Sequence, residues 1–254
     1  MNCMADFKSR ENRAFAYEIK YALPTELARE VRAWARAHMQ RDPNTASGSG
    51  DVYRITSLYY DTYGFDVYHH RGSFGRAKYR ARRYDSCDRA FLERKLRTRS
   101  VVTKRRTLVD IDELDRLGEM EPDRGWAGAW FHARMLGRAM HPACQVSYSR
   151  TALVSETGAG LARLTLDEDL RAWRVSRPEY APLGGGAPIF PGRTILEMKF
   201  RMAVPSLFKQ IVEEFGLEAE TISKYKLAVT GLGCAPLPRP SKAIGVVQAE
   251  VACA

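Results

Sequence analysis

The sequence predicts an α+β domain, in which an eight-stranded antiparallel β-barrel is flanked by helices. Eight segments alternate apolar and polar residues with a period of two, which indicates strands with two different faces. Short helical patterns lie between and after these segments. The 254 residues suffice to bury a substantial core as one domain, or as two small ones at most. Closure into a barrel removes the exposed edges of an open sheet and leaves room inside for side chains or one ligand.

The strands follow one another along most of the chain. Charged alternation marks the third to fifth, and the turn Glu156–Gly160 joins the sixth and seventh as a hairpin. We expect strands at Phe15–Leu23, Arg54–Tyr60, Arg76–Tyr84, Ala90–Arg97, Thr103–Asp110, Gln145–Ser155, Leu161–Arg171 and Thr194–Arg201.

The first helix follows the first strand and opens at Pro24-Thr25. Its apolar stripe is expected to be Leu27, Val31, Trp34 and His38, spaced i, i+4, i+7 and i+11. Further helical patterns are Ile111–Leu117, a segment through Trp126, Trp130, Ala133 and Gly137, Ser206–Phe215 before Gly216, and Ile222–Thr230. Residues 42–50 and 178–192 have the composition of loops.

The ends of the chain lack strong structural signals. We expect a flexible segment at residues 1–13, a folded domain at 14–233 and a disordered tail at 234–254. Residues 1–13 have no apolar signal core, and no apolar run approaches the roughly 20 residues of a spanning helix. Five dispersed cysteines favour a reducing compartment over a disulfide framework or a zinc site. These features favour a cytoplasmic protein without direct membrane insertion, although a membrane-protein partner stays open.

The net charge of +10 lies in one part of the chain. Residues 76–106 contain thirteen Lys or Arg against three acids, and the charges elsewhere cancel. Within this window Lys78, Arg80 and Arg82 share one strand face, about 7 Å apart. The following strands add Lys95, Lys104 and Arg106. A solvated strand face is the alternative, but such a row repels itself, and phosphate oxygens would neutralise it.

Three Glu-x-Lys pairs recur in apolar alternating runs. They are Glu18 with Lys20, Glu93 with Lys95, and Glu197 with Lys199. Each pair places a carboxylate and an ammonium on one strand face. One copy would indicate a surface strand, whereas three indicate a lined cavity. Carboxylates among phosphate-binding cations can hold Mg²⁺ or Mn²⁺.

Two later segments add polar groups. Arg163, Thr165, Asp167 and Asp169 share one strand face by alternation, with a cross-strand salt bridge as the alternative role for Asp169. Ser223 and Lys224 begin a helix whose N-terminus could accept an anion, although capped surface helices that carry lysine are common and this motif alone is a weak signal. Tyr79 alternates away from the cations, which argues against a stacking platform for nucleic acid.

Six short motifs occur in a fixed order along the chain. They are YEIKY (17–21), SLYYDT (57–62), KYRARRY (78–84), FLERK (91–95), LEMKF (196–200) and SKYKLAV (223–229). Together they resemble the motifs of the VTC domain, the catalytic domain of vacuolar transporter chaperone polyphosphate polymerases, in the triphosphate tunnel metalloenzyme (CYTH-like) superfamily. The resemblance covers about residues 15–232, and only the combination is specific. The fuller superfamily signature has a further glutamate where this chain has Ala16, which suits the VTC branch.

The resemblance implies an eight-stranded tunnel that binds ATP and inorganic polyphosphate. It implies transfer of the γ-phosphoryl group of ATP to a growing polyphosphate chain, with Mn²⁺ or Mg²⁺. Catalytic contacts are expected from Lys20, Arg80, Arg82, Lys95 and Lys224. Substrate binding is expected from Lys78, Lys104, Arg106, Arg150, Arg163 and Ser223. The metal is expected at Glu197, with Glu18 and Glu93 as helpers. A tunnel phosphohydrolase and a module that only binds polyanions remain open.

Overall fold

A computed structural model describes residues 17–43, 45, 50–85, 87–98, 101–158 and 160–235, without the side chains of residues 97, 98, 101 and 102. The expected flexible segment at 1–13 lies outside the described residues, as does 236–254 of the expected tail.

The described chain is built around one antiparallel sheet. Its eight long strands follow the order β1-β10-β8-β7-β3-β4-β5-β6, while β2 pairs with β7 and β9 with β8. The strands are β1 Tyr17–Pro24, β2 Gln40–Arg41, β3 Val52–Thr62, β4 Ala77–Tyr84, β5 Arg89–Thr98, β6 Val101–Asp110, β7 Met140–Thr157, β8 Gly160–Arg174, β9 Ala187–Pro188 and β10 Arg193–Phe200. The α+β class and the eight antiparallel strands are therefore confirmed.

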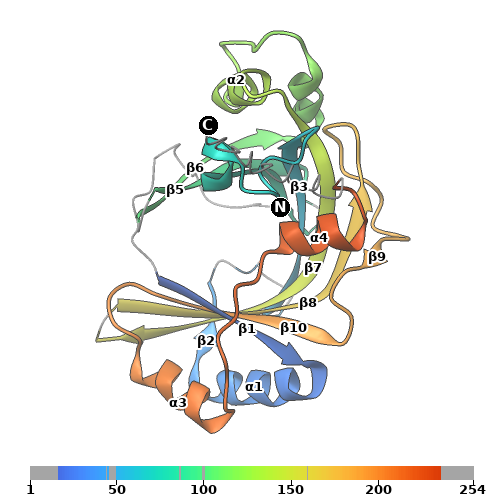
Figure 1. Ribbon diagram of the computed structural model, residues 1–254. Coiled ribbons are helices and arrows are strands. Elements are labelled where there is room, and N and C mark those ends of the chain that lie inside the picture. The colour runs from blue at the N-terminus through green and yellow to red at the C-terminus, as the bar shows by residue number, and fades with distance from the viewer. Residues whose placement is uncertain are drawn as a thin grey trace, which may run out of the picture.

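The sheet curls strongly but is not strictly closed. Figure 1 shows β1, β8 and β10 in one half, β5 and β6 in the other, and the long strand β7 running between them. Within the described residues, the end strands β1 and β6 do not pair with each other. Side chains connect the two halves instead, because Lys95 Nζ on β5 lies 3.4 Å from Glu18 Oε2 on β1.

Helices cover the outer side of both halves. In Figure 1, α1 and α3 pack below β1 and β10, α2 lies beyond β5 and β6, and α4 lies beside β7. The helices are α1 Thr25–His38, α2 Ala129–Leu136, α3 Ser206–Glu214 and α4 Lys224–Gly231, with 3₁₀ helices η1 Gly72–Arg76 and η2 Ile111–Gly118. Within the described ranges, none of them is both long and apolar enough to cross a membrane.

Helix α1 buries a different stripe from the expected one. Ala28, Val31 and Ala35 are fully buried against the sheet, because alanines allow the helix to approach closely. His38 is exposed and stacks on Trp34 with ring centroids 4.0 Å apart. The expected stripe was therefore correct at Val31 and wrong at His38.

The limits of several strands differ from the expected ones, most of all at the start of β7. Strand β7 begins at Met140 rather than Gln145, and its pairing with β3 shifts between Tyr59 and Tyr60, where Pro142 faces Tyr60. The two-residue strands β2 and β9 were not expected, since such short segments carry no periodicity. These differences leave the order of the sheet unchanged.

Three of the five cysteines lie in the described residues. Cys144 is a buried free thiol and Cys234 a half-buried one. Cys87 is disulfide-bonded, which its spacing in the sequence did not indicate.

Candidate phosphate and metal site

The expected cations share one face of the curved sheet. Lys78, Arg80 and Arg82 alternate along β4 with Tyr79, which is 3 % exposed. The Tyr79 ring packs on the other face against Phe131 of α2, with centroids 5.9 Å apart. The alternation read from the sequence therefore holds, and the ionic groups face away from the core under α2.

The Glu93 cluster, defined as Arg80, Arg82, Glu93 and Lys104, lies on β4, β5 and β6. Glu93 is 1 % exposed, and its Oε2 lies 2.7 Å from Arg80 Nη2 and 3.9 Å from Arg82 Nε. Lys104 pairs with the other oxygen, Oε1. Burial alone would raise the pKa of Glu93, but Arg80, Lys104 and Arg82 hold it well below its usual value. The carboxylate is thus ionised and surrounded by cations.

The Glu197 cluster lies on the other half of the sheet and on α4. It comprises Lys20 and Glu18 of β1, Glu197 and Lys199 of β10, Arg150 of β7, Asp167 of β8, and Lys224 of α4. Glu197 alone pairs with four cations, Lys20 at 3.5 Å, Lys199 at 3.2 Å, Lys224 at 3.3 Å and Arg150 at 3.7 Å. Burial opposes ionisation here too, yet Lys224, Lys199 and Lys20 hold the pKa of Glu197 well below its usual value.

Glu18 belongs to the same cluster. It pairs with Lys20 at 3.0 Å, Lys95 at 3.4 Å and Lys199 at 3.6 Å. Burial raises the pKa of Glu18, but Lys199, Lys20 and Lys95 together outweigh it and set the pKa at about 2. The structure thus groups Glu18 with Glu197 around shared lysines, whereas Glu93 lies in the other cluster.

Asp167 is a functional candidate that the sequence reasoning did not select. It is fully buried and accepts two bonds from Arg150, Nε to Oδ1 at 2.5 Å and Nη2 to Oδ2 at 2.6 Å. Lys224 Nζ lies 2.5 Å from Oδ2. Asp169 was expected on the same face, but its φ of 49° interrupts the alternation, and it pairs with Arg171 near the surface. The cross-strand partner of Arg150 is therefore Asp167.

Hydrogen bonds connect the start of helix α4 to strands in both halves of the sheet. Ser223 caps the helix by accepting the Lys226 N–H, as expected, and Lys78 Nζ donates to Ser223 Oγ at 2.9 Å. Lys20 Nζ donates to the carbonyl of Ile222 at 3.1 Å. Lys224 is thereby held over β7 and β8, with its ammonium 4.9 Å from the centroid of the Tyr148 ring.

Burial and neighbouring charges shift the pKa values of three lysines in the site. Burial, together with Lys20, Lys95 and Arg80, lowers the pKa of Lys78 to about 8. Burial also lowers the pKa of Lys104 to about 8, with Arg80 and Arg82 acting in the same direction against Glu93. Lys224 differs, because Asp167 and Glu197 outweigh its burial and raise its pKa. Lys78 and Lys104 therefore lose their protons more readily than an exposed lysine does.

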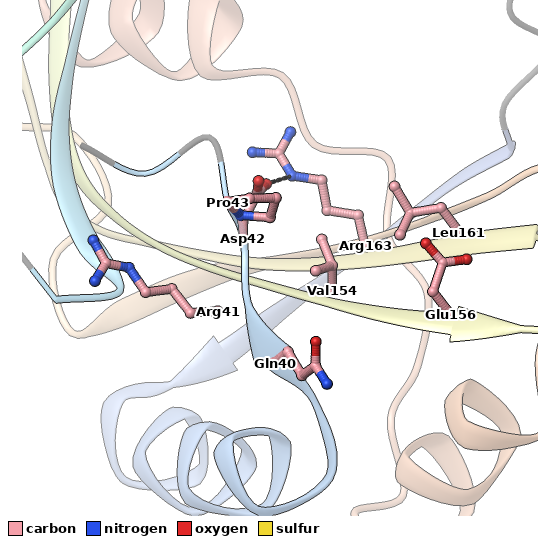
Figure 2. Close-up of a pocket in the computed structure, with 8 residues that line it drawn as sticks. All are labelled: Gln40, Arg41, Asp42, Pro43, Val154, Glu156, Leu161 and Arg163. Atoms are coloured by element: carbon pink, nitrogen blue, oxygen red, sulfur yellow. Dashed lines mark ion pairs between the residues drawn. The ribbon is translucent and has the colours of Figure 1, made fainter. Parts of the chain in front are cut away.

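Arg163 lies at the end of this face and borders a pocket of about 350 Å³. Its Nε lies 2.6 Å from Asp42 Oδ2, and its Nη2 donates to the Tyr53 hydroxyl at 3.2 Å. Figure 2 shows Arg163 reaching towards Asp42, with Leu161 and Glu156 on the opposite wall. The pocket is lined by Gln40, Arg41, Asp42, Pro43, Val154, Glu156, Leu161 and Arg163.

Arg106 lies on β6 beside the Glu93 cluster. It faces Glu93 in the pairing of β5 with β6. Its guanidinium carbon lies 4.9 Å from the centroid of the Phe91 ring. The expected site residues on the strands therefore lie on one face, around two clusters, and Ser223 and Lys224 of α4 lie against that face.

The carboxylates suit a divalent ion that is bound together with phosphate. Within the described residues, no group of three or more His, Cys, Asp or Glu side chains is placed to hold a metal. Glu197 and Glu18 supply two neighbouring carboxylates, which is the donor set that Mg²⁺ uses when phosphate oxygens and water complete its coordination. Glu197 and Glu18 therefore fit a divalent ion whose remaining ligands are phosphate oxygens and water, and do not by themselves form a complete coordination sphere.

The fold and the site define an open-sided antiparallel barrel whose inner face carries paired carboxylates and cations. The chain belongs to the VTC domain family, whose model matches residues 15–232. No curated protein matches the chain.

The chain is similar to several solved structures, but its sequence identity to them is low. A candidate adenylate cyclase from Bacillus halodurans is 11 % identical, with a TM-score of 0.48 over 83 % of this chain and 93 % of that one. A protein from Hippeastrum, described as a candidate adenylyl cyclase with a dominant triphosphatase activity, is 17 % identical, with a TM-score of 0.45 over 87 % and 97 %. A protein from Pyrococcus horikoshii is 15 % identical, with a TM-score of 0.45 over 84 % and 99 %.

Proposed function

We propose that this protein is a metal-dependent polyphosphate polymerase, which transfers the γ-phosphoryl group of ATP to a growing inorganic polyphosphate chain. One observation carries the proposal: two clusters of ion-paired cations, some buried and some half-buried, line a single face of the sheet, in a chain of the VTC family. Cations at two-residue spacing on neighbouring strands match a row of phosphates, because each phosphate carries charge and several acceptor oxygens.

The proposed reaction needs no covalent bond between the protein and the transferred phosphoryl group. A terminal oxygen of the polyphosphate chain attacks the γ-phosphorus, the bond from that phosphorus to the β-phosphate oxygen breaks, and ADP leaves. Catalysis is then positioning and neutralisation of charge. Lys20, Arg80, Arg82, Lys95 and Lys224 would hold the reacting phosphates. Lys78, Lys104, Arg106, Arg150, Arg163 and Ser223 would bind the flanking phosphates.

The carboxylates have a separate role in this proposal. Glu197 and Glu18 would hold Mn²⁺ or Mg²⁺, and a bound ion would neutralise charge on the phosphate oxygens. Glu93 was expected to help with the metal. Its contacts with Arg80 and Lys104 favour instead a role in fixing the direction of those two side chains.

Most of the site's cations already have a carboxylate as their partner, which bears on how the substrate would enter. Arg150 and Lys224 share Asp167, and Arg80 and Lys104 share Glu93. Buried cations without partners are costly, so these carboxylates keep the site folded when no phosphate is bound. Phosphate would then take the remaining donor positions or replace a carboxylate.

Polymer growth is the decisive test. Purified protein is incubated with ATP, Mn²⁺ and a short polyphosphate primer, and chain length is followed on gels. We expect long chains and an equal yield of ADP from the unaltered protein, and none from Glu197→Ala. Release of free phosphate without growth of chains would indicate a phosphohydrolase. Tight polyphosphate binding without consumption of ATP would indicate a binding module.

A further inference from the structure

One buried hydroxyl beside the Glu197 cluster has no partner among the described residues. Thr165 lies on β8 between Arg163 and Asp167, opposite Glu197 of β10 and Ala152 of β7. Its side chain is 1 % exposed, and its Oγ1 makes no hydrogen bond with any described residue. A buried hydroxyl without a partner costs free energy, so native proteins satisfy it with protein, water or ligand.

The strand geometry aims this hydroxyl at the ionic face. Residues two apart on a strand share a face, and both neighbours of Thr165 at that spacing contact ionic-face groups. Asp167 pairs with Arg150, and Arg163 donates to the Tyr53 hydroxyl. Thr165 therefore points to the same side as these groups.

The charged groups near Thr165 indicate which kind of ligand its hydroxyl would bind. The carboxylate of Glu197, directly opposite, already contacts Lys20, Lys199, Lys224 and Arg150. An anion attracted by these cations would bring acceptor oxygens to the uncommitted O–H donor. We infer that Thr165 is a phosphate ligand, which donates its hydroxyl hydrogen bond to an oxygen of the polyanion bound at the Glu197 cluster. The inference rests on the proposed function, because it requires a phosphate chain on this face.

The adjacent strand offers a matched control. Thr151 on β7 is also 1 % exposed with an unpartnered hydroxyl within the described part of the chain. It pairs with Leu166 and alternates away from Arg150, so its side chain lies on the opposite face of the sheet. Replacing either threonine by valine removes one buried hydroxyl from the same pair of strands, but only one of the two faces the ionic groups.

The test measures binding of inorganic tripolyphosphate by titration calorimetry, with EDTA and then with Mn²⁺. We expect Thr165→Val to weaken binding about tenfold in both conditions, since a hydrogen bond to a charged group is lost. Thr165→Ser keeps the hydroxyl and should stay within about threefold, and Thr151→Val should leave binding unchanged. Thermal unfolding of all variants separates lost binding from lost folding.

Three results would overturn the inference. Equal binding by Thr165→Val and the unaltered protein would show that the hydroxyl is not a ligand, while leaving the proposed function intact. Weakening only in the presence of Mn²⁺ would show that the hydroxyl acts on the metal rather than on phosphate. Failure of the unaltered protein itself to bind tripolyphosphate would overturn the proposed function together with the inference.

Discussion

Asp61 of β3 accepts the phenolic hydrogen bond of Tyr225 of α4, and this contact ties the central sheet to the helix that carries Lys224. Asp61 is fully buried and also accepts the backbone N–H groups of Thr62 at 2.7 Å, Val67 at 2.9 Å and Tyr68 at 3.0 Å. One carboxylate thus orders the loop after β3 and anchors α4.

Removal of the Tyr225 hydroxyl should weaken this anchor. In Tyr225→Phe the ring still packs against Tyr59, but Asp61 loses one donor in a buried place. We expect the free energy of unfolding to fall by about 1–3 kcal/mol, as measured by urea titration. Tyr63→Phe is the control, because Tyr63 is 81 % exposed and should change nothing measurable. Equal stability of the two variants would contradict the anchoring role.

The charge on Glu197 should oppose phosphate when no metal is present. Glu197→Gln removes one negative charge from among four cations while keeping the shape of the side chain. We therefore expect tripolyphosphate to bind Glu197→Gln more tightly in EDTA, by about tenfold, whereas ATP-dependent turnover falls at least about a hundredfold. Calorimetry and a coupled ADP assay measure the two effects. Glu213→Gln, an exposed site on α3, should behave as the unaltered protein. Weaker binding by Glu197→Gln would refute the electrostatic argument.

Phosphate binding should be accompanied by uptake of protons above pH 8. The pKa values of Lys78 and Lys104 are both about 8 in the folded protein, so each ammonium is largely deprotonated at pH 9. A bound polyanion favours the charged form and raises both pKa values. At pH 8.5 we expect uptake of about one proton per tripolyphosphate, from calorimetry in buffers with different ionisation enthalpies.

Arginine replacements provide the control for this uptake. Arginine stays protonated at pH 8.5, so the double variant Lys78→Arg, Lys104→Arg should bind tripolyphosphate with almost no proton uptake. Its affinity should then change little between pH 7 and pH 9, whereas that of the unaltered protein falls. Undiminished uptake by the double variant would assign the protons to other groups.

The carboxylates make folding sensitive to acid. Glu18, Glu93, Glu197 and Asp167 have lower pKa values in the folded than in the unfolded chain, and that of Glu18 is about 2. Their contribution is fully present above about pH 5 and is lost as the pH falls towards 2, because the unfolded chain binds protons first. Urea titrations at pH 7, 5, 4 and 3 should show stability declining only below about pH 5.

One substitution isolates the contribution of the Glu93 cluster. Glu93→Gln leaves Arg80 and Lys104 without their carboxylate, which should cost about 3–5 kcal/mol at pH 7. The decline of stability towards pH 3 should also be shallower, since one proton-binding group has been removed. Glu213→Gln should keep both the stability and the slope. A Glu93→Gln protein with the unaltered acid profile would contradict the linkage.

Much of this architecture could be predicted from the sequence because strand alternation dictates which side chains share a face. Lys78, Arg80 and Arg82 lie together for that reason, and so does the buried Tyr79 behind them. The cap of α4 at Ser223 was equally readable, because a serine before a helical segment offers an acceptor for a free N–H.

Other parts of the site could not be predicted, because they depend on features that the alternation of residues along a strand does not show. The reversal of alternation at Asp169 comes from a left-handed backbone conformation, and only the fold shows that Asp167 rather than Asp169 meets Arg150. The separation of Glu93 from Glu197 arises because β5 and β10 lie in different halves of the sheet. Local spacing gives the face of a strand but not the distance between strands far apart in the chain.

The order of strands also governs when the site can exist during synthesis. Strand β1 emerges from the ribosome first, but its hydrogen-bonding neighbour is β10, near the end of the described chain. The neighbouring strands β3, β4, β5 and β6 can pair soon after they emerge, so the Glu93 cluster can assemble early. Lys20 must wait for Glu197 and then for α4, so the Glu197 cluster assembles only when nearly the whole domain has been made. A nascent or truncated chain would therefore carry the basic half of the site long before it carries the half that we assign to the metal.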